Sequence, residues 1–184
     1  AMAYTYPEFA NVTRIHQEAG RRYSMEIELN PGGSKTFIVI QKNPSRANAE
    51  VSDHTINRVL NYLYRNQGKY ASLEGLQKVV FLNLIPWYET YSDRLAEKQT
   101  ELSDLKNLHT IEASLSSGNP CIIAWGNPPK GLGKPYASLA EKVLGLLGRY
   151  GNSVYHVGGL TRLGFPRHGQ IWGYTDPMRN IKLM

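Results

Sequence analysis

Short runs of apolar residues recur along the chain, separated by segments whose apolar residues have helical spacing. Four of these runs are rich in β-branched and other large apolar side chains, which is typical of strands buried on both faces of a sheet. They are TFIVIQ (36–41), VVFLNLI (79–85), CIIAWG (121–126) and SVYHVGG (153–159). The pattern therefore predicts a central sheet of about four strands.

A further segment has the pattern of a half-buried strand. Residues 23–29, YSMEIEL, alternate between apolar and polar positions. The turn NPGGSK (30–35) connects this segment to the first apolar run, because proline presets one dihedral and glycine permits positive φ. We expect 23–29 and 36–41 to form an antiparallel hairpin that leads into the sheet.

Amphipathic segments lie between the apolar runs and predict helices at 54–67, 104–116 and 136–151. The first follows Ser52 and Asp53, either of which can cap its N-terminus. Strands that alternate with helices indicate crossover connections and parallel strands. The predicted fold class is α/β: a three-layer α/β/α domain with a mostly parallel central sheet of about four strands and an N-terminal antiparallel strand or hairpin.

The length of 184 residues is that expected of a single domain, 1–184. Residues 1–3, AMA, are interpreted as a remnant of cloning and are left out of the prediction. Residues 86–103 form the longest stretch without a clear pattern. They are predicted to be an excursion from the domain: a lid, a partner surface or a solvated loop.

Charge and cysteine content narrow the function classes. The chain has 21 Lys and Arg against 15 Asp and Glu, a net charge of +6, which favours a polyanionic partner such as nucleic acid. Cys121 is the single cysteine, so no intramolecular disulfide forms, and its apolar surroundings predict a buried, inert thiol. We expect a cytoplasmic protein without a membrane segment, since no apolar run is long enough to span a bilayer.

The residues that follow the predicted strands are the candidates for a binding site, because open parallel sheets bind ligands beyond the carboxyl ends of their strands. These residues are mostly amides and small residues, with one imidazole. They are Asn43-Pro44-Ser45, Asn83, Trp125-Gly126-Asn127, Gly158-Gly159 and His168.

The residues that several common enzyme classes require are missing from this predicted edge. Paired carboxylates, a serine nucleophile elbow and a phosphate-binding Gly-Lys-Ser/Thr loop are not found there. The five histidines are scattered, so we predict no metal site and no cofactor.

Each candidate also has a purely structural interpretation. Asn43 can cap the following turn, and Asn83 can satisfy nearby backbone groups. Trp125 can belong to the core, and His168 can bond to the backbone. The functional interpretation depends on their joint order along the chain.

That order resembles an uncharacterised bacterial and phage family, a domain of unknown function. The segments that carry the resemblance are NPSRANAEVSDHTINRV, VVFLNLI, IIAWGN and GFPRHG. The family has N-P-S-x-A, D-x-T-I-x-R, N-L, W-G-N and P-x-H-P-L elements, and the likeness covers most of residues 23–172. Gly169 stands where this family usually has proline.

The same elements, in the same order, resemble the uracil-DNA glycosylase superfamily. Asn43 falls on the position of the residue that serves the attacking water, and Pro44 matches. Ser45 replaces a Gly or Tyr, which would leave room for a substituent at C5 of a pyrimidine. Asn83 in VFLN falls on the residue that reads the pyrimidine edge. His168 falls on the histidine that stabilises the departing base, although the Pro-Ser that follows it in many members is missing.

The resemblance implies a DNA base glycosylase that hydrolyses the N-glycosidic bond of a uracil-like or 5-modified pyrimidine flipped out of single- or double-stranded DNA. Repair, or defence against phage with modified DNA, would be its role. Asn43 would orient water, and His168 and Asn83 would donate to the base. Trp125, in IAWG, would belong to the base site. Asp53 would supply a carboxylate if the loop folds back, or simply cap the helix.

The DNA backbone would be held by basic residues around this edge. The candidates are Arg46, Arg162, Arg167 and Lys130. Trp87, Tyr88 and Trp172 are candidates for stacking or wedging. Two alternatives remain open: an inactive module of the same fold that binds nucleic acid or a modified base, and an enzyme that acts on free nucleosides or nucleotides.

Overall fold

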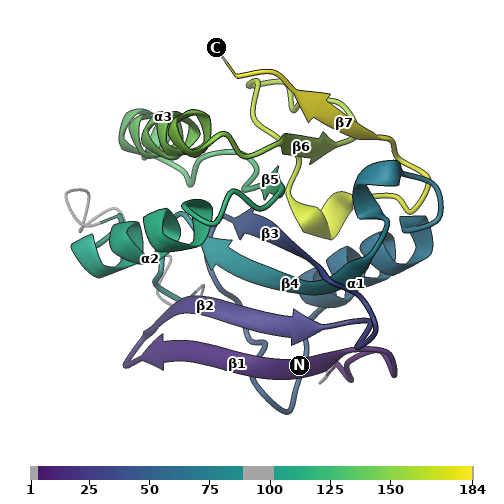
Figure 1. Cartoon of the computed structure of the whole chain (residues 1–184). Helices are drawn as coiled ribbons and strands as arrows, with labels where there is room; N and C mark the ends of the chain where they lie inside the picture. Colours follow the sequence, from purple (N-terminus) through teal and green to yellow (C-terminus); the bar gives the residue numbers. More distant parts are fainter. Residues whose placement is uncertain (1–3, 89–101, 184) are drawn as a thin grey trace.

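The structure is a computed structural model that describes residues 4–88 and 102–183, and it shows a mixed sheet between two helical layers (Figure 1). The strands are β1 (Asn11–Glu18), β2 (Arg21–Glu28), β3 (Lys35–Gln41), β4 (Leu76–Asn83), β5 (Cys121–Ala124), β6 (Val154–Val157) and β7 (Met178–Ile181). The helices are α1 (His54–Asn66), α2 (Leu105–Leu115) and α3 (Gly133–Tyr150), with short 3-10 turns η1 (Ala71–Leu73) and η3 (Gly169–Ile171).

The described strands form one seven-stranded sheet in the order β1-β2-β4-β3-β5-β6-β7. The four central strands, β4-β3-β5-β6, are parallel to one another, whereas β1, β2 and β7 run antiparallel to their neighbours. The α/β class and the parallel centre are therefore as predicted. The predicted N-terminal antiparallel strand is β2, which pairs with β4. The predicted sheet was too small, because β1 and β7 also extend its two edges.

The predicted hairpin between 23–29 and 36–41 is wrong. β2 pairs with β1 and β4, and β3 instead lies between β4 and β5. The physical reason is that β3 is apolar on both faces, so it is best buried at the centre of the sheet. β1 and β2 form the hairpin, through a turn in which Gly20 has φ of +72°.

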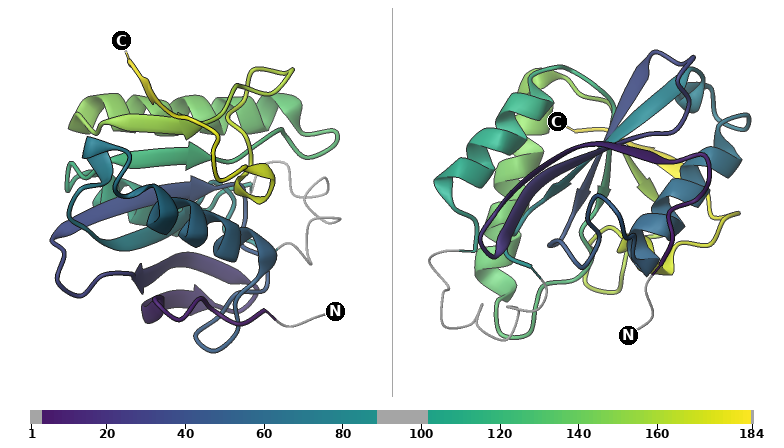
Figure 2. Two further views of the ribbon diagram at one scale, coloured as in Figure 1. Left: turned by 90° about the vertical axis from the view of Figure 1, so that its right-hand side faces the viewer. Right: turned by 90° about the horizontal axis from the view of Figure 1, so that it is seen from below.

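Alternate residues of the central strands face two separate cores. Phe37 and Val39 of β3 pack on the side of α1, whereas Ile38 and Ile40 pack on the side of α2 and α3. Figure 2 shows α2 and α3 together on one face of the sheet, with α1 on the other. The predicted three-layer arrangement is confirmed.

The helix predictions are confirmed, with small shifts in the boundaries. Asp53 caps α1 by accepting from the Ile56 N–H, and Asp104 caps α2 by accepting from the Asn107 N–H. α3 begins at Gly133 rather than Tyr136.

Two strands were missed by the sequence patterns. β1 (NVTRIHQE) is mostly exposed and has no apolar run, and β7 has only four residues within the irregular tail after Leu160. Cys121 is fully buried in β5, as predicted, and burial raises the pKa of its thiol.

Within residues 4–88 and 102–183, no helix combines the length and the apolar character needed to cross a bilayer. Most of the predicted excursion, 89–101, lies outside the described residues, as does the segment 1–3. The role of 86–103 as a lid or partner surface therefore stays a prediction.

Candidate functional site

The sheet has a topological switch point between β3 and β5. The loop after β3 leads to α1 on one face, whereas the loop after β5 leads to α3 on the opposite face (Figure 1). In open α/β sheets, ligands bind beyond the carboxyl ends of two adjacent parallel strands whose loops diverge in this way. We call the residues at this point, 42–45 and 125–127, the β3–β5 edge.

The loop that follows β3 is held by Asp53. One carboxylate oxygen of Asp53 accepts from the Ile56 N–H at 2.8 Å and so caps α1. The other accepts from the Ser45 hydroxyl and from the Ala47 N–H, the latter at 3.1 Å. Both oxygens of Asp53 are thus engaged in shaping the loop. The loop does fold back on Asp53, and the carboxylate clamps it through these hydrogen bonds.

Asn43 and Pro44 lie at the tip that Asp53 clamps. Pro44 is buried, and Asn43 is partly exposed. The Asn43 amide makes no hydrogen bond with another residue in the described ranges. It is therefore available to a ligand or to water at the β3–β5 edge.

The turn after β5 is fixed by residues from two other parts of the chain. Tyr136 of α3 donates its hydroxyl to the carbonyl oxygens of Trp125, at 2.7 Å, and Gly126, at 3.1 Å. Gly126 has φ of +68°, and a Cβ there would lie 3.0 Å from the Cβ of His168. The Gly126 N–H donates to the Pro166 carbonyl at 2.9 Å. The WGN and PRHG motifs are therefore in direct contact, at a position where the close approach and the positive φ favour glycine.

His168 presents one defined hydrogen-bond donor. Its Nδ1 accepts from the Gln170 N–H at 3.2 Å, so in the neutral ring the proton is on Nε2. Burial, and then the positive charge of Lys42, lower the pKa of His168 to about 4, while Asp53 acts in the opposite direction. At neutral pH the ring is uncharged, and its Nε2–H donates to no residue in the described part of the chain.

The neighbour of His168 explains a departure from the expected motif. A Cβ on Gly169 would lie 2.6 Å from Cγ2 of Val59 in α1. The segment therefore packs closely against α1 at a position where this chain needs glycine.

Asn83 is at the same edge but lies beneath its surface. It pairs with Gln41 at the ends of β4 and β3, and its side chain is 0% exposed. Its Nδ2 donates to the carbonyl of Arg22 at 3.2 Å, and its Oδ1 has no partner among the described residues. The predicted contact with a base would require the loop above Asn83 to open.

Two of the predicted aromatic residues, Trp125 and Trp172, are buried and not placed for stacking. Trp125 and Trp172 are each 1% exposed and belong to the two cores. Trp87 is half-buried, with the Arg21 guanidinium 4.8 Å from its ring centre. The Tyr88 hydroxyl donates to Gln17 at 2.8 Å. Trp125 therefore supports the edge from within the core and cannot stack on a base.

Three of the four predicted backbone-binding residues are exposed: Arg46, Lys130 and Arg162. Arg162 follows Thr161, whose hydroxyl donates to the Asn127 side chain at 2.6 Å and so joins its loop to the β3–β5 edge. Arg167 is the exception: its guanidinium packs against Gly158 and lies 3.7 Å from a carboxylate oxygen of Asp176.

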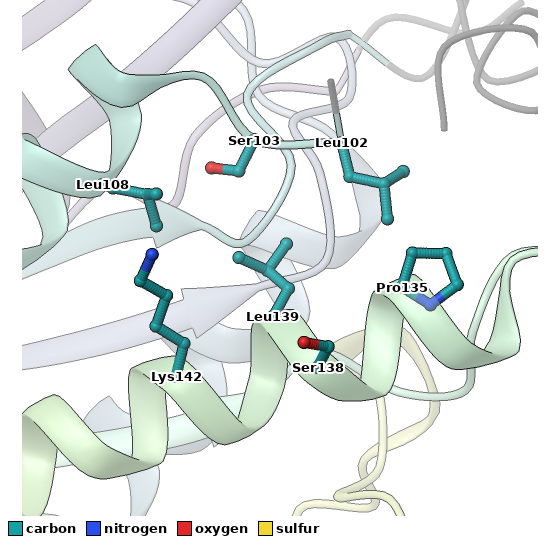
Figure 3. A pocket seen from close by; sticks show the side chains of 7 residues that line it. All are labelled: Leu102, Ser103, Leu108, Pro135, Ser138, Leu139 and Lys142. Atoms are coloured by element: carbon teal, nitrogen blue, oxygen red, sulfur yellow. The ribbon is translucent and has the colours of Figure 1, made fainter. Parts of the chain in front are cut away.

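A hollow of about 200 Å³ lies elsewhere, between the start of α2 and the side of α3 (Figure 3). It is lined by three leucines, two serines, a proline and Lys142, and none of the predicted site residues lines it. Among the described residues, no group of three or more His, Cys, Asp or Glu side chains is placed to hold a metal ion.

One residue near the site was missed by sequence reasoning. Arg22 is 0% exposed, and its Nη1 donates to the Ala47 carbonyl at 2.8 Å. The register between β1 and β2 shifts between His16 and Gln17, leaving Tyr23 without a partner in the ladder, and such a bulge redirects side chains. An arginine at the start of an amphipathic strand predicts an exposed residue, so the sequence offered no signal for its burial.

The fold and the site together define a class: an α/β domain with a doubly wound parallel centre and polar residues at its switch point. The family model described as "Protein of unknown function (DUF1643)" matches residues 22–169, and the chain belongs to this family. The match includes the four parallel strands and all three described helices, and it leaves out β1 and β7. Comparison with curated proteins gave no significant match, and comparison with solved structures gave none either.

The protonation of His168 gives a prediction that is independent of function. The folded protein should bind a proton at His168 near pH 4, whereas an unfolded chain binds it near pH 6.5. Since the unfolded state then binds more protons, stability is fully present above about pH 6.5 and is lost as pH falls towards 4, by at most about 3 kcal/mol.

NMR titration of the histidine rings measures the midpoint directly. Urea unfolding at pH 7 and pH 4.5 measures the linked loss, which should be smaller in His168→Gln than in the wild type. A His168 ring that titrates near pH 6.5 would contradict the buried, neutral state.

Proposed function

We propose that the chain is a DNA base glycosylase that acts on a flipped pyrimidine in the cytoplasm. The observation that carries the proposal is the position of His168: a neutral imidazole, with Nε2–H as its free donor, packed over Gly126 at the switch point. The same edge carries Asn43 on a clamped loop. A donor and a water-orienting amide at one edge suit N-glycosidic hydrolysis.

The chemistry needs charge stabilisation more than a strong base. As the bond between the sugar C1′ and the base nitrogen breaks, negative charge develops on the base and positive charge on the sugar. The Nε2–H of His168 can donate to the base oxygen as that charge grows. Asn43 can orient the water that adds to C1′, and the departing base takes up a proton. Asp53 has no part in this step other than to hold the loop.

Basic residues around the edge support a nucleic-acid substrate. Arg46, Lys130 and Arg162 are exposed, and the chain carries a net charge of +6. Such residues neutralise phosphates, so binding to DNA is expected to weaken steeply as salt is raised. Removal of a 5-modified pyrimidine, in repair or in defence against phage, is the biological role that we propose.

The test uses oligonucleotides that carry uracil or a hydroxymethylated or glycosylated pyrimidine at one position, single- and double-stranded. Alkali treatment after incubation cleaves any abasic site. We expect scission of at least one substrate, and its loss in Asn43→Ala and His168→Ala. No scission of any substrate would overturn the glycosylase proposal, and scission unchanged in both variants would overturn the site.

A second function is favoured by one observation. Both carboxylate oxygens of Asp53 accept hydrogen bonds that hold the loop and cap α1, so none of the predicted site residues offers a carboxylate free of such bonds to activate water. A module that binds a modified base or nucleic acid without cleaving it would need no such group. Tight, salt-sensitive binding of the same oligonucleotides without scission would support this alternative.

A further inference from the structure

The side chain of Arg22 has one edge that no described residue occupies. Its Nη1 donates to the Ala47 carbonyl at 2.8 Å, whereas Nε and Nη2 are buried and have no partner in the described part of the chain. In a guanidinium, Nε–H and one N–H of Nη2 point in the same direction. This edge is the one that binds carboxylates and similar planar groups through two parallel hydrogen bonds.

The neighbouring side chain of Asn83 also has a buried polar atom without a hydrogen-bond partner in the described part of the chain. The Nδ2 of Asn83 donates to the carbonyl of Arg22, and Oδ1 of Asn83 is buried and without a partner among the described residues. Both residues are 0% exposed. We call Arg22, Asn83 and Ala47 the Arg22 site. It contains two unpaired donors and one unpaired acceptor in a place where unpaired polar groups are costly.

The charge of Arg22 is also poorly compensated. Burial lowers the pKa of its guanidinium, and the negative charge of Asp53 acts in the opposite direction. The oxygens of Asp53 are already bonded to Ser45, Ala47 and Ile56. A buried cation without a directly bonded anion is destabilising unless a negative group joins it.

The Arg22 site is near the end of the sheet where ligands bind in open α/β folds. It lies beneath the loop that follows β3 and beside the end of β4, at the edge of the sheet where parallel strands present their carboxyl ends. The bulge in β2 turns Arg22 inward at this point.

We propose that the Arg22 site binds a planar anionic group with two adjacent acceptor atoms, held side-on by Nε and Nη2 of Arg22. A carboxylate of a small molecule has this chemistry, and so does an ionised pyrimidine, whose ring nitrogen and neighbouring carbonyl oxygen are adjacent acceptors. Because the site is sealed, the ligand enters when the segment 43–53 moves away from it. The inference holds whether or not the chain is a glycosylase.

The experiment measures the melting temperature of the whole chain in sodium formate, in sodium chloride and in uracil with chloride at the same ionic strength. Formate is planar with two acceptor oxygens, whereas chloride is spherical. At a concentration about a hundred times its Kd, a ligand of the folded state should raise the melting temperature by about 5–10 °C. Stabilisation by formate points to a free carboxylate, and stabilisation by uracil that grows as it ionises points to a base.

A local measurement connects the effect with Arg22. In a ¹⁵N-labelled protein, the Nε–H signal of Arg22, identified by its absence in Arg22→Lys, should move on addition of the stabilising ligand. Arg22→Lys retains the charge but lacks the two-donor edge, so it should lose most of the stabilisation. Arg21→Lys is the matched control, since Arg21 is partly exposed and paired with Asp104, and it should respond as the wild type does.

The wild-type series alone can overturn the proposal, even if Arg22→Lys does not fold. Equal melting temperatures in formate, uracil and chloride would show that the Arg22 site takes no planar anion. If oligonucleotide scission fails while formate or uracil stabilises the chain, the Arg22 inference stands and the glycosylase proposal falls.

Discussion

Replacing His168 by alanine is expected to slow base release by about 10²- to 10³-fold, which is the usual cost of removing one preorganised donor from a developing negative charge. The expectation rests on the proposed glycosylase activity and on one atom, the Nε2–H of His168. Single-turnover scission assays on the best oligonucleotide substrate measure the effect. Binding of the same oligonucleotide should change much less, because the donor interacts most strongly as the base leaves.

The variant should remain folded, because other contacts hold the segment in place. The Gly126 N–H donates to the Pro166 carbonyl, and Trp172 donates through Nε1 to the Arg167 carbonyl at 3.2 Å. His168→Gln retains an amide donor and is expected to recover part of the rate. His109→Ala, on the exposed side of α2, is the matched control and should leave the rate unchanged.

The pH dependence separates a neutral donor from a charged one. Since the pKa of His168 is lowered to about 4, its ring stays neutral from about pH 5.5 upwards, and its contribution to the rate should be constant there. A rate that rises as pH falls through 6.5 and loses this rise in His168→Gln would mean that the imidazolium is the active form. That outcome would contradict the neutral Nε2–H donor.

The sequence predicted the central strands and the cap of α1 because these depend on local patterns. Apolar runs such as TFIVIQ require burial on both faces, and Asp53 precedes a helical repeat. The contact between the turn after β5 and the segment around His168 could also be predicted from the sequence, because both follow neighbouring parallel strands. These features involve residues whose neighbours along the chain already indicate where they lie.

The features that the sequence did not predict depend on partners far along the chain. β1 has no apolar run of its own and is a strand because β2 offers it an edge. Arg22 turns inward at a register shift between β1 and β2, and no local sequence pattern predicts this shift. Likewise, Asn83 was placed correctly at a strand end, but its burial beneath the loop depends on Arg22.

Replacement of Asp53 is expected to reduce stability strongly, because Asp53 performs two tasks at once. Asp53→Ala removes the cap on the Ile56 N–H, which costs about 1 kcal/mol. It also leaves the Ser45 hydroxyl and the buried Ala47 N–H without their acceptor. The free energy of unfolding is expected to fall by about 2–5 kcal/mol in total. Urea unfolding and a decrease in melting temperature of about 5–15 °C measure it.

Asp53→Asn separates the clamp from the cap. Asparagine caps helices as well as aspartate does, so α1 should keep its cap. Its NH₂ group cannot accept from the Ala47 N–H, so the clamp on the loop that carries Asn43 should be lost. Asp104→Asn is the matched control: Asp104 caps α2, and its second oxygen bonds to Arg21 and Tyr23, away from the β3–β5 edge.

The two variants distinguish a positioning role from general-base catalysis. If Asp53 positions the loop, Asp53→Asn should lower the rate of base release by a similar factor at every pH, and Asp104→Asn should leave that rate unchanged. If Asp53 were the base, the wild-type rate would fall in acid as the carboxylate is protonated, and this fall would disappear in Asp53→Asn. Because both Asp53 oxygens already accept hydrogen bonds from Ser45, Ala47 and Ile56, we expect the first result.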